Sequence, residues 1–347
     1  MNKLVWVLLA LVIAGVVVGS VLLMRMPEPA ADVVLDPADN PVAASGKQTY
    51  SLAVDGSNRQ FIVYRPETLE AEAEVPVVFM FHGSGQSGEQ FYKDSGWVDK
   101  ADEEGFMVVF PTALKYHVFS DEKIVNGKLK TDVATYQTKW NSYELPGLFD
   151  PAFPPQTAAD DLAFTDAMLT FLDENYAVDN ERIYATGFSN GAQFTMRLAV
   201  ERSDVFAAFA PTSGGRIPDE VIAKIEAASQ KPSPRPVVQV VGANDAKANY
   251  ASGVDVFTTD ESAANDGDPI KDNYITNYLV LEQLEDEYVY EELMNSAHFT
   301  YAESTAGADN EYQLYVVGNM GHIYPNENNF RVDITDIFWP FFEQYSL

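Results

Sequence analysis

Cysteine is absent from the 347-residue chain. Its absence excludes disulfide bonds, thiolate nucleophiles and metal sites with cysteine ligands, and it leaves no thiol from which to infer the redox compartment. Basic residues are scarce beside acidic ones, 22 against 52, so the formal net charge is −30. A surface of this sign repels nucleic acid and anionic lipid, and it favours a soluble monomer whose partner is neutral or cationic.

The N-terminus carries an uncharged run, "LVWVLLALVIAGVVVGSVLLM", at residues 4–24. It exceeds the roughly 18 residues that mark a membrane span, whereas the apolar core of a secretory signal has about 7–15. Residues 1–25 therefore predict a retained membrane anchor in preference to a cleaved signal peptide. Either segment predicts an extracytoplasmic protein. Residues 26–46 are rich in Pro, Ala and Asp without apolar periodicity, which is typical of a linker.

Residues 47–347 are predicted to form one α/β domain. The stretch "QTYSLAVDGSNRQFIVYRP" alternates around a turn at residues 55–58 and predicts an antiparallel hairpin at a sheet edge. Beyond it, short apolar runs alternate with helical stretches, which predicts a mostly parallel central sheet covered by helices on both faces. The expected strands are 75–81, 107–110, 182–186, 206–211, 236–241 and 312–317, and the expected helices are 158–176, 190–202 and 336–345, the last interrupted by Pro340.

Two long segments, 116–157 and 246–296, do not fit the short connections of such a fold. The second is acidic and has one clear helical piece, at residues 274–284. Excursions at strand ends often form the rim of a site, although plain surface elaboration is the alternative. The acidic stretch "DESAANDGDP" at 260–269 does not have the spacing of a helix-loop-helix calcium loop, so no metal site is predicted.

The segment "IYATGFSNGAQF" at 183–194 passes from an apolar run through Gly-x-Ser-x-Gly into a helical pattern. A sharp turn between a strand and a helix would lift the Ser189 hydroxyl above the carboxyl edge of the sheet, where open α/β folds bind ligands. Gly187 and Gly191 would let strand and helix approach closely around a strained residue. This context indicates a nucleophile, whereas an ordinary turn serine would need neither glycine.

A serine hydroxyl is a weak nucleophile, so it needs a base and a carboxylate that orients the base. Of the four histidines, His322 lies in the Gly-rich loop "GNMGHIYP" after the last expected strand, and it is the predicted base. Asp245 follows the strand "PVVQVV" and completes the order Ser, Asp, His, so it is the predicted acid. The expected donors to a developing oxyanion are the N–H groups of Asn190 and of Ser84, in "FHGSG".

These motifs, together with "ADDLAFTDAML" and "VGANDAKANY", resemble the polyhydroxybutyrate depolymerase-like esterases, which are related to bacterial feruloyl and acetylxylan esterases. The resemblance covers most of residues 51–345. It implies the α/β-hydrolase fold, with Ser189 as nucleophile, Asp245 as acid and His322 as base. The chain departs from the family in two places: Ser84 replaces a common cysteine and Tyr324 a common tryptophan, and both bear on pocket shape.

The sequence therefore predicts an extracytoplasmic serine esterase acting on a small-molecule or polymeric ester, such as hydroxyalkanoate, feruloyl or acetyl esters, without a cofactor. An acyltransferase with the same triad is one alternative. A non-catalytic binding protein on a hydrolase scaffold is the other.

Overall fold

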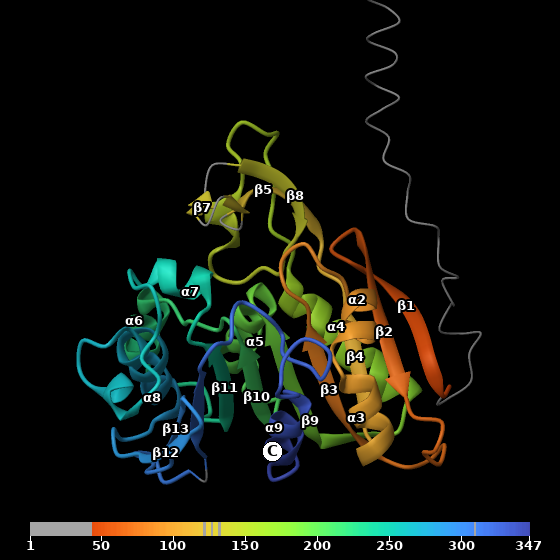
Figure 1. Cartoon of the computed structure of the whole chain (residues 1–347). Coiled ribbons are helices and arrows are strands. Elements are labelled where there is room, and N and C mark those ends of the chain that lie inside the picture. The colour runs from red at the N-terminus through yellow and green to blue at the C-terminus, as the bar shows by residue number, and fades with distance from the viewer. Residues whose placement is uncertain (1–43, 121–122, 126–127, 131–132, 309) are drawn as a thin grey trace, which may run out of the picture. The chain divides into compact units, whose positions relative to one another are not determined.

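The computed structural model describes residues 44–347 except 121–122, 126–127, 131–132 and 309. Its framework is a ten-stranded sheet within those residues (Figure 1). In spatial order the strands are β1 (Gly46–Val54), β2 (Ser57–Arg65), β4 (Met107–Pro111), β3 (Val75–Phe81), β9 (Val178–Phe188), β10 (Ala208–Thr212), β11 (Val237–Gly242), β14 (Tyr312–Val317), β13 (Ser296–Tyr301) and β12 (Val289–Leu293). The six strands from β4 to β14 run parallel, and an antiparallel hairpin flanks them at each edge.

Helices cover both faces of the sheet because its central strands are apolar on both sides. In β3, Val77 and Phe79 belong to one hydrophobic core, and Val78 and Met80 belong to the other. The first core is completed by α4 (Asp161–Asn175), α5 (Asn190–Glu201), α6 (Asp219–Ala227) and α8 (Thr276–Glu282). The second is completed by α2 (Gly88–Asp94), α3 (Trp97–Glu104) and α9 (Thr335–Phe342). The predicted mostly parallel, doubly covered sheet is confirmed.

Several individual predictions differ from the structure. The strand expected at 182–186 extends over residues 178–188. The hairpin of β12 and β13 was not predicted, because β12 has exposed side chains and carries acidic residues. The predicted interruption at Pro340 is wrong, since α9 continues through that residue. Its apolar side chains, among them Phe338 and Phe342, are buried in the second core. Their packing holds the helix in place although Pro340 has no backbone N–H to donate.

The first excursion, and residues 246–251 of the second, lie at the edge where the parallel strands end (Figure 1). The first forms two small sheets, β5 (Lys115–Ser120) with β8 (Val133–Thr138) and β6 (Lys123–Val125) with β7 (Lys128–Lys130), followed by the 3-10 turn η2 (Leu145–Leu148). The second contains α7 (Ala246–Ala251), the 3-10 turn η3 (Glu261–Ala264) and the π-helical turn η4 (Lys271–Ile275), and α8 is the helix expected there.

The N-terminal predictions lie largely outside the described residues. These are the anchor or signal at 1–25 and the linker at 26–46, of which only residues 44–46 are described. The folded domain begins with β1 at Gly46, one residue before the predicted boundary. Within the described part of the chain, no helix is long and apolar enough to cross a membrane.

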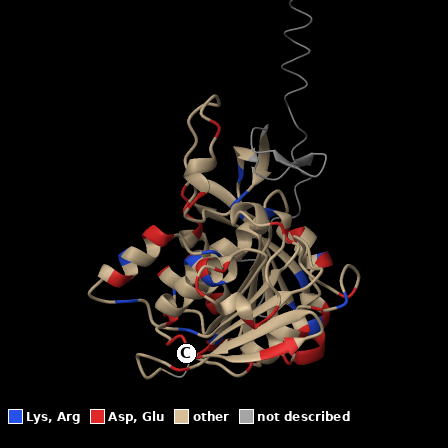
Figure 2. Cartoon of the chain, turned by 60° about the vertical axis from the view of Figure 1, so that its left-hand side comes forward, with Lys and Arg blue, Asp and Glu red and all other residues tan. Residues whose placement is uncertain are grey.

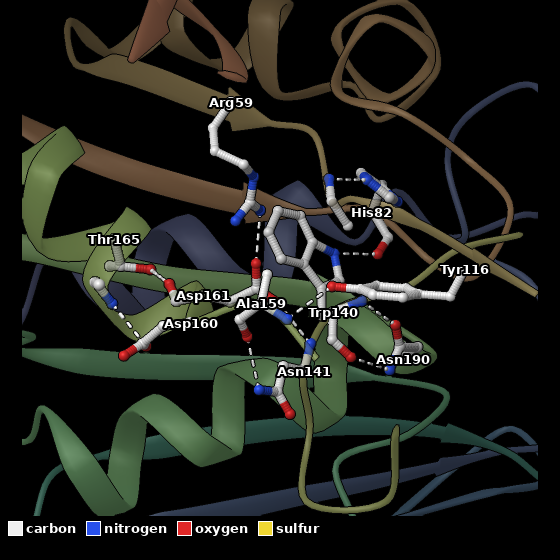
Figure 3. A network of polar contacts seen from close by, with 12 residues as sticks. Arg59, His82, Tyr116, Trp140, Asn141, Ala159, Asp160, Asp161, Thr165 and Asn190 are labelled. Carbon is white, nitrogen blue, oxygen red and sulfur yellow. Dashed lines mark hydrogen bonds and ion pairs between the residues drawn. The ribbon is translucent and has the colours of Figure 1, made fainter. Parts of the chain in front are cut away.

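Charged residues are distributed over helices, strands and loops of the described chain (Figure 2). One pair of opposite charge, Arg59 and Asp161, is buried inside the protein. Arg59 Nη2, from β2, lies 2.6 Å from Asp161 Oδ1 at the start of α4, and the two side chains are 1% and 0% exposed. Asp161 Oδ2 accepts a hydrogen bond from Asn141 N at 2.6 Å (Figure 3). This ion pair therefore joins the edge hairpin, α4 and the first excursion.

We predict that Arg59→Met lowers the free energy of unfolding by about 3–5 kcal/mol, because it leaves the Asp161 carboxylate buried without its cation. Arg182→Met is the control, since it removes a partly exposed ion pair with Asp179 and should cost less than about 1 kcal/mol. Urea unfolding followed by circular dichroism measures both. Similar losses in the two variants would contradict a structural role for the buried pair.

Candidate active site

Ser189 occupies a tight turn between β9 and α5. Its backbone has φ 54° and ψ −116°, a conformation that costs a non-glycine residue about 1–3 kcal/mol. Two backbone hydrogen bonds hold it there: Ser189 N donates to Thr212 O at 2.9 Å, and Gln193 N donates to Ser189 O at 3.0 Å. The backbone of Ser189 is thus held by hydrogen bonds to the neighbouring strand β10 and to helix α5.

Gly187 and Gly191 permit the close approach that shapes this turn. A Cβ at Gly191 would stand 2.1 Å from Phe81 O at the end of β3, and a Cβ at Gly187 would stand 2.4 Å from Gly191 O. Neither position has room for a side chain. Glycine at both positions therefore lets the strand and the helix approach this closely, as the sequence predicts.

The structure brings Ser189, His322 and Asp245 together from three strand ends. His322 Nε2 lies 2.9 Å from Ser189 Oγ, and His322 Nδ1 lies 2.7 Å from Asp245 Oδ2. Asp245 is fully buried, and its Oδ1 accepts from Lys247 N at 3.0 Å and Ala248 N at 3.2 Å. With Nδ1–H donating to the carboxylate, Nε2 is left to accept the serine proton.

The loops that carry Asp245 and His322 are joined to each other. Asn244 N donates to Met320 O at 2.9 Å, and Asn319 N donates to Asn244 Oδ1 at 3.1 Å. The Phe188 ring lies beside the imidazole of His322, with 5.0 Å between ring centroids. These contacts hold the imidazole between the carboxylate and the hydroxyl.

Ser84 and Asn190 lie at the same cavity as Ser189. No hydrogen bond joins the backbone N–H of either residue to another described residue. The first N–H groups of a helix, such as that of Asn190 in α5, have no partner within the helix and are available to a ligand. Both amides are thus unengaged in the described chain.

Trp140, known from the sequence only as an aromatic residue of the first excursion, connects these two donor segments (Figure 3). Trp140 N donates to Asn190 Oδ1 at 2.7 Å, Asn190 Nδ2 donates to Trp140 O at 3.2 Å, and Trp140 Nε1 donates to His82 O at 2.9 Å. The indole is fully buried. No local pattern in the sequence signals this connection, because the partners of Trp140 lie 50 and 58 positions away from it.

None of the other three histidines is hydrogen-bonded to Ser189 within the described chain. His82 is buried, and its Nε2 accepts from Ala113 N at 3.1 Å. His117 pairs with Asp150 in the first excursion, and His298 stacks on a tyrosine of β14. Within the described chain, no group of three or more His, Asp or Glu side chains is arranged to hold a metal ion.

A cavity of about 360 Å³ opens in front of Ser189. Both excursions line it, with Lys139 and Glu144 from the first and Tyr250 and Tyr274 from the second. Tyr324 does not line the cavity. It is buried behind Phe188, where its hydroxyl accepts from Trp97 Nε1 at 2.7 Å.

Comparison with curated proteins finds several named esterases. The chain is 26% identical to a bifunctional acetylxylan esterase/xylanase of Neocallimastix patriciarum, 26% to feruloyl esterase B of Thermothelomyces thermophilus and 27% to poly(3-hydroxyalkanoate) depolymerase C of Paucimonas lemoignei. The matches cover 56%, 50% and 54% of this chain. They span only 22%, 50% and 38% of the relatives' own lengths.

A solved acetyl xylan esterase from Aspergillus awamori has the same fold. It superposes with a TM-score of 0.50 at 15% identity, over 85% of this chain and 99% of that one. The model of the dienelactone hydrolase family matches residues 63–265, more than half of the chain, including the Ser189 turn and Asp245. The chain therefore belongs to the dienelactone hydrolase family and has its α/β-hydrolase fold.

Proposed function

We propose that the protein is a serine esterase that hydrolyses carboxylic esters through an acyl-enzyme. The observation that carries this proposal is the hydrogen-bonded series of Ser189, His322 and Asp245, with distances of 2.9 and 2.7 Å, beside a cavity. Relatives named as acetylxylan esterase, feruloyl esterase and poly(3-hydroxyalkanoate) depolymerase support an ester substrate of one of these kinds.

In the proposed reaction, Ser189 Oγ attacks the ester carbonyl while its proton passes to His322 Nε2. Asp245 holds the imidazole in the required tautomer and stabilises the imidazolium that forms. The tetrahedral intermediate collapses to the acyl-enzyme, and His322 returns the proton to the departing alcohol. Water, deprotonated by His322, then releases the carboxylic acid and restores Ser189.

The N–H groups of Ser84 and Asn190 are the proposed donors to the oxyanion. Donors fixed in advance stabilise the charge that develops on the carbonyl oxygen, and losing one such donor typically costs about 2.7–4 kcal/mol in the barrier. Trp140 supports this role because it joins Asn190 to the loop that contains Ser84. The two donors would then keep a constant separation.

We predict that Ser189→Ala lowers kcat for p-nitrophenyl butyrate by at least about a thousandfold, because no other hydroxyl of the described residues is hydrogen-bonded to His322. Ser229→Ala, at an exposed position, is the matched control and should keep wild-type turnover. A fluorophosphonate probe should label the wild type and the control, but not Ser189→Ala. Turnover by Ser189→Ala close to that of the wild type would refute the assignment.

His82 is proposed to position the donor loop rather than to transfer protons. Burial lowers its pKa to about 4, so the ring is neutral in the folded protein at pH 7 and its Nε2 accepts from Ala113 N. In the unfolded chain a histidine has a pKa of about 6.5. As the pH falls, His82 therefore binds a proton in the unfolded chain before it does so in the folded protein. The free energy of unfolding that neutral His82 contributes above pH 6.5 is lost between pH 6.5 and pH 4.

We predict that His82→Gln reduces this pH dependence, because glutamine accepts the same hydrogen bond without titrating. Between pH 7 and pH 4, the wild type should lose about 3 kcal/mol more of its free energy of unfolding than the variant loses. Urea unfolding at the two pH values measures the difference. Parallel losses in the two proteins would show that His82 is not the residue responsible.

The proposed location of the domain is outside the cytoplasm, and this proposal rests on the uncharged run at 4–24. We predict that the full chain sediments with membranes, that protease added to spheroplasts digests it, and that deletion of residues 4–24 leaves it in the cytoplasm. A mature N-terminus beyond residue 25 in the soluble fraction would favour a cleaved signal, whether the protein is secreted or periplasmic. Protection of the full chain from protease added to spheroplasts would contradict export.

A further inference from the structure

One peptide group, between Trp140 and Asn141, connects the buried carboxylate of Asp161 to the turn that carries the nucleophile (Figure 3). Its N–H, on Asn141, donates to Asp161 Oδ2 at 2.6 Å. Its carbonyl, on Trp140, accepts from Asn190 Nδ2 at 3.2 Å. Because a peptide group is planar and its N–H and C=O point in opposite directions, fixing the N–H also fixes where the carbonyl points. Asp161 therefore sets the direction of a carbonyl that holds the side chain of Asn190.

The side chain of Asn190 is held entirely from residues 140–142. Its Oδ1 accepts from Trp140 N at 2.7 Å, and its Nδ2 donates both to Trp140 O and to Ser142 Oγ, each at 3.2 Å. The residue is only 5% exposed. The amide thus uses its acceptor and both of its donor hydrogens within one short segment of the first excursion, so that segment determines the orientation of Asn190.

The orientation of Asn190 matters because its backbone N–H is a proposed oxyanion donor. The direction of that N–H is set by the ψ angle of Ser189, which is −116° at a φ of 54°. A strained backbone of this kind relaxes toward commoner angles unless its neighbours hold it. Relaxation of Ser189 would move Asn190 relative to the strand before it. The hydrogen bonds on the Asn190 side chain oppose that movement and keep the direction of the N–H constant.

Asp161 is itself fixed in the interior. It is the first residue of α4, where the helix favours a carboxylate, and Arg59 Nη2 lies 2.6 Å from its Oδ1. The guanidinium carbon of Arg59 lies 4.1 Å from the centroid of the Phe164 ring. A buried ion pair seldom stabilises a fold more than apolar side chains of similar size would, so folding alone does not account for it. An apolar pair could not supply the acceptor for Asn141 N.

We propose that Asp161 is a positioning residue for the oxyanion donor of Asn190, acting through the peptide group between Trp140 and Asn141, and that Arg59 holds its carboxylate in place. The proposal rests on the proposed esterase function. A carboxylate that accepts from the N–H of a peptide group also polarises it and strengthens its carbonyl as an acceptor. Since oxyanion donors act mainly in the transition state, loss of the Asp161 acceptor should lower kcat and leave KM unchanged.

Two double variants that differ only at residue 161 test the proposal. Arg59→Met with Asp161→Leu, the leucine variant, removes the ion pair and the acceptor for Asn141 N. Arg59→Met with Asp161→Asn, the asparagine variant, removes the charges and keeps an amide oxygen that can accept. Neither leaves an unpaired buried charge, so both should fold. With p-nitrophenyl butyrate, the leucine variant should lose about 10- to 100-fold in kcat per site titrated with fluorophosphonate, and the asparagine variant should recover most of that loss.

An inhibitor distinguishes positioning from partial unfolding. A trifluoromethyl ketone with an alkyl chain adds to Ser189 as a hemiketal whose oxyanion needs the same donors as the transition state. Its Ki should therefore rise in the leucine variant by the factor by which kcat falls. Partial unfolding would lower the number of titrated sites without changing Ki. As the matched control, Arg202→Met with Asp166→Leu removes a more exposed Arg–Asp pair of α4 and should keep wild-type kcat and Ki.

A double-mutant cycle tests the route through Asn190. Asn190→Ala removes the side chain and keeps the backbone N–H, so it should lower kcat by itself. If Asp161 acts through that side chain, Asn190→Ala should cost little more when it is added to the leucine variant. Fully additive losses would overturn the proposal. Equal kcat in the leucine and asparagine variants would also overturn it, because the acceptor for Asn141 N would then have no effect on turnover.

The same measurements separate this proposal from the esterase function. If the wild type neither hydrolyses p-nitrophenyl butyrate nor reacts with fluorophosphonate, the esterase function fails and the positioning role fails with it. If the wild type does both and the leucine and asparagine variants do not differ in kcat or Ki, the esterase function stands and the positioning role fails alone.

Discussion

The candidate site depends on the contact between the start of α5 and the end of β3. The carbonyl oxygen of Phe81 occupies the space where residue 191 would have its side chain, so α5 can begin against β3 only with glycine there. Because the helix starts so close to the strand, the chain has to reverse at Ser189, and the serine takes the strained backbone conformation that exposes its hydroxyl. Packing on both faces of the sheet offsets this strain.

The parallel sheet supplies the rest of the site through its geometry. Strands β3, β9, β11 and β14 are joined in parallel within the sheet, so the segments that follow them emerge at one edge. Those segments carry Ser84, Ser189, Asp245 and His322. Hydrogen bonds between loops, such as Asn244 N to Met320 O, then fix the separations that the sheet alone leaves open. The sheet brings the groups near each other, and the loops determine their distances.

A feature of the fold or the site could be predicted from the sequence when the residues that produce it lie close together along the chain. The apolar runs and the glycines around Ser189 are local signals, and they predicted the central strands and the turn. Asp245 and His322 could be predicted because each lies in the short loop that follows a strand. Trp140 has its role through contacts with residues 50 and 58 positions away, which no local pattern encodes. Likewise, α9 continues through its proline because a buried aromatic face holds it, and a local rule does not weigh that face.

The net charge of the chain illustrates why composition does not determine the chemistry of a site. At distances beyond about 8–10 Å in physiological salt, the surplus of acidic residues on the surface is largely screened. Inside the cavity the screening is weaker, so charges near Ser189 act more strongly there than distant charges do. Lys139 is fixed there by the same excursion that joins Ser84 to Asn190. The attachment that orders the proposed oxyanion donors thus also places Lys139 at the cavity.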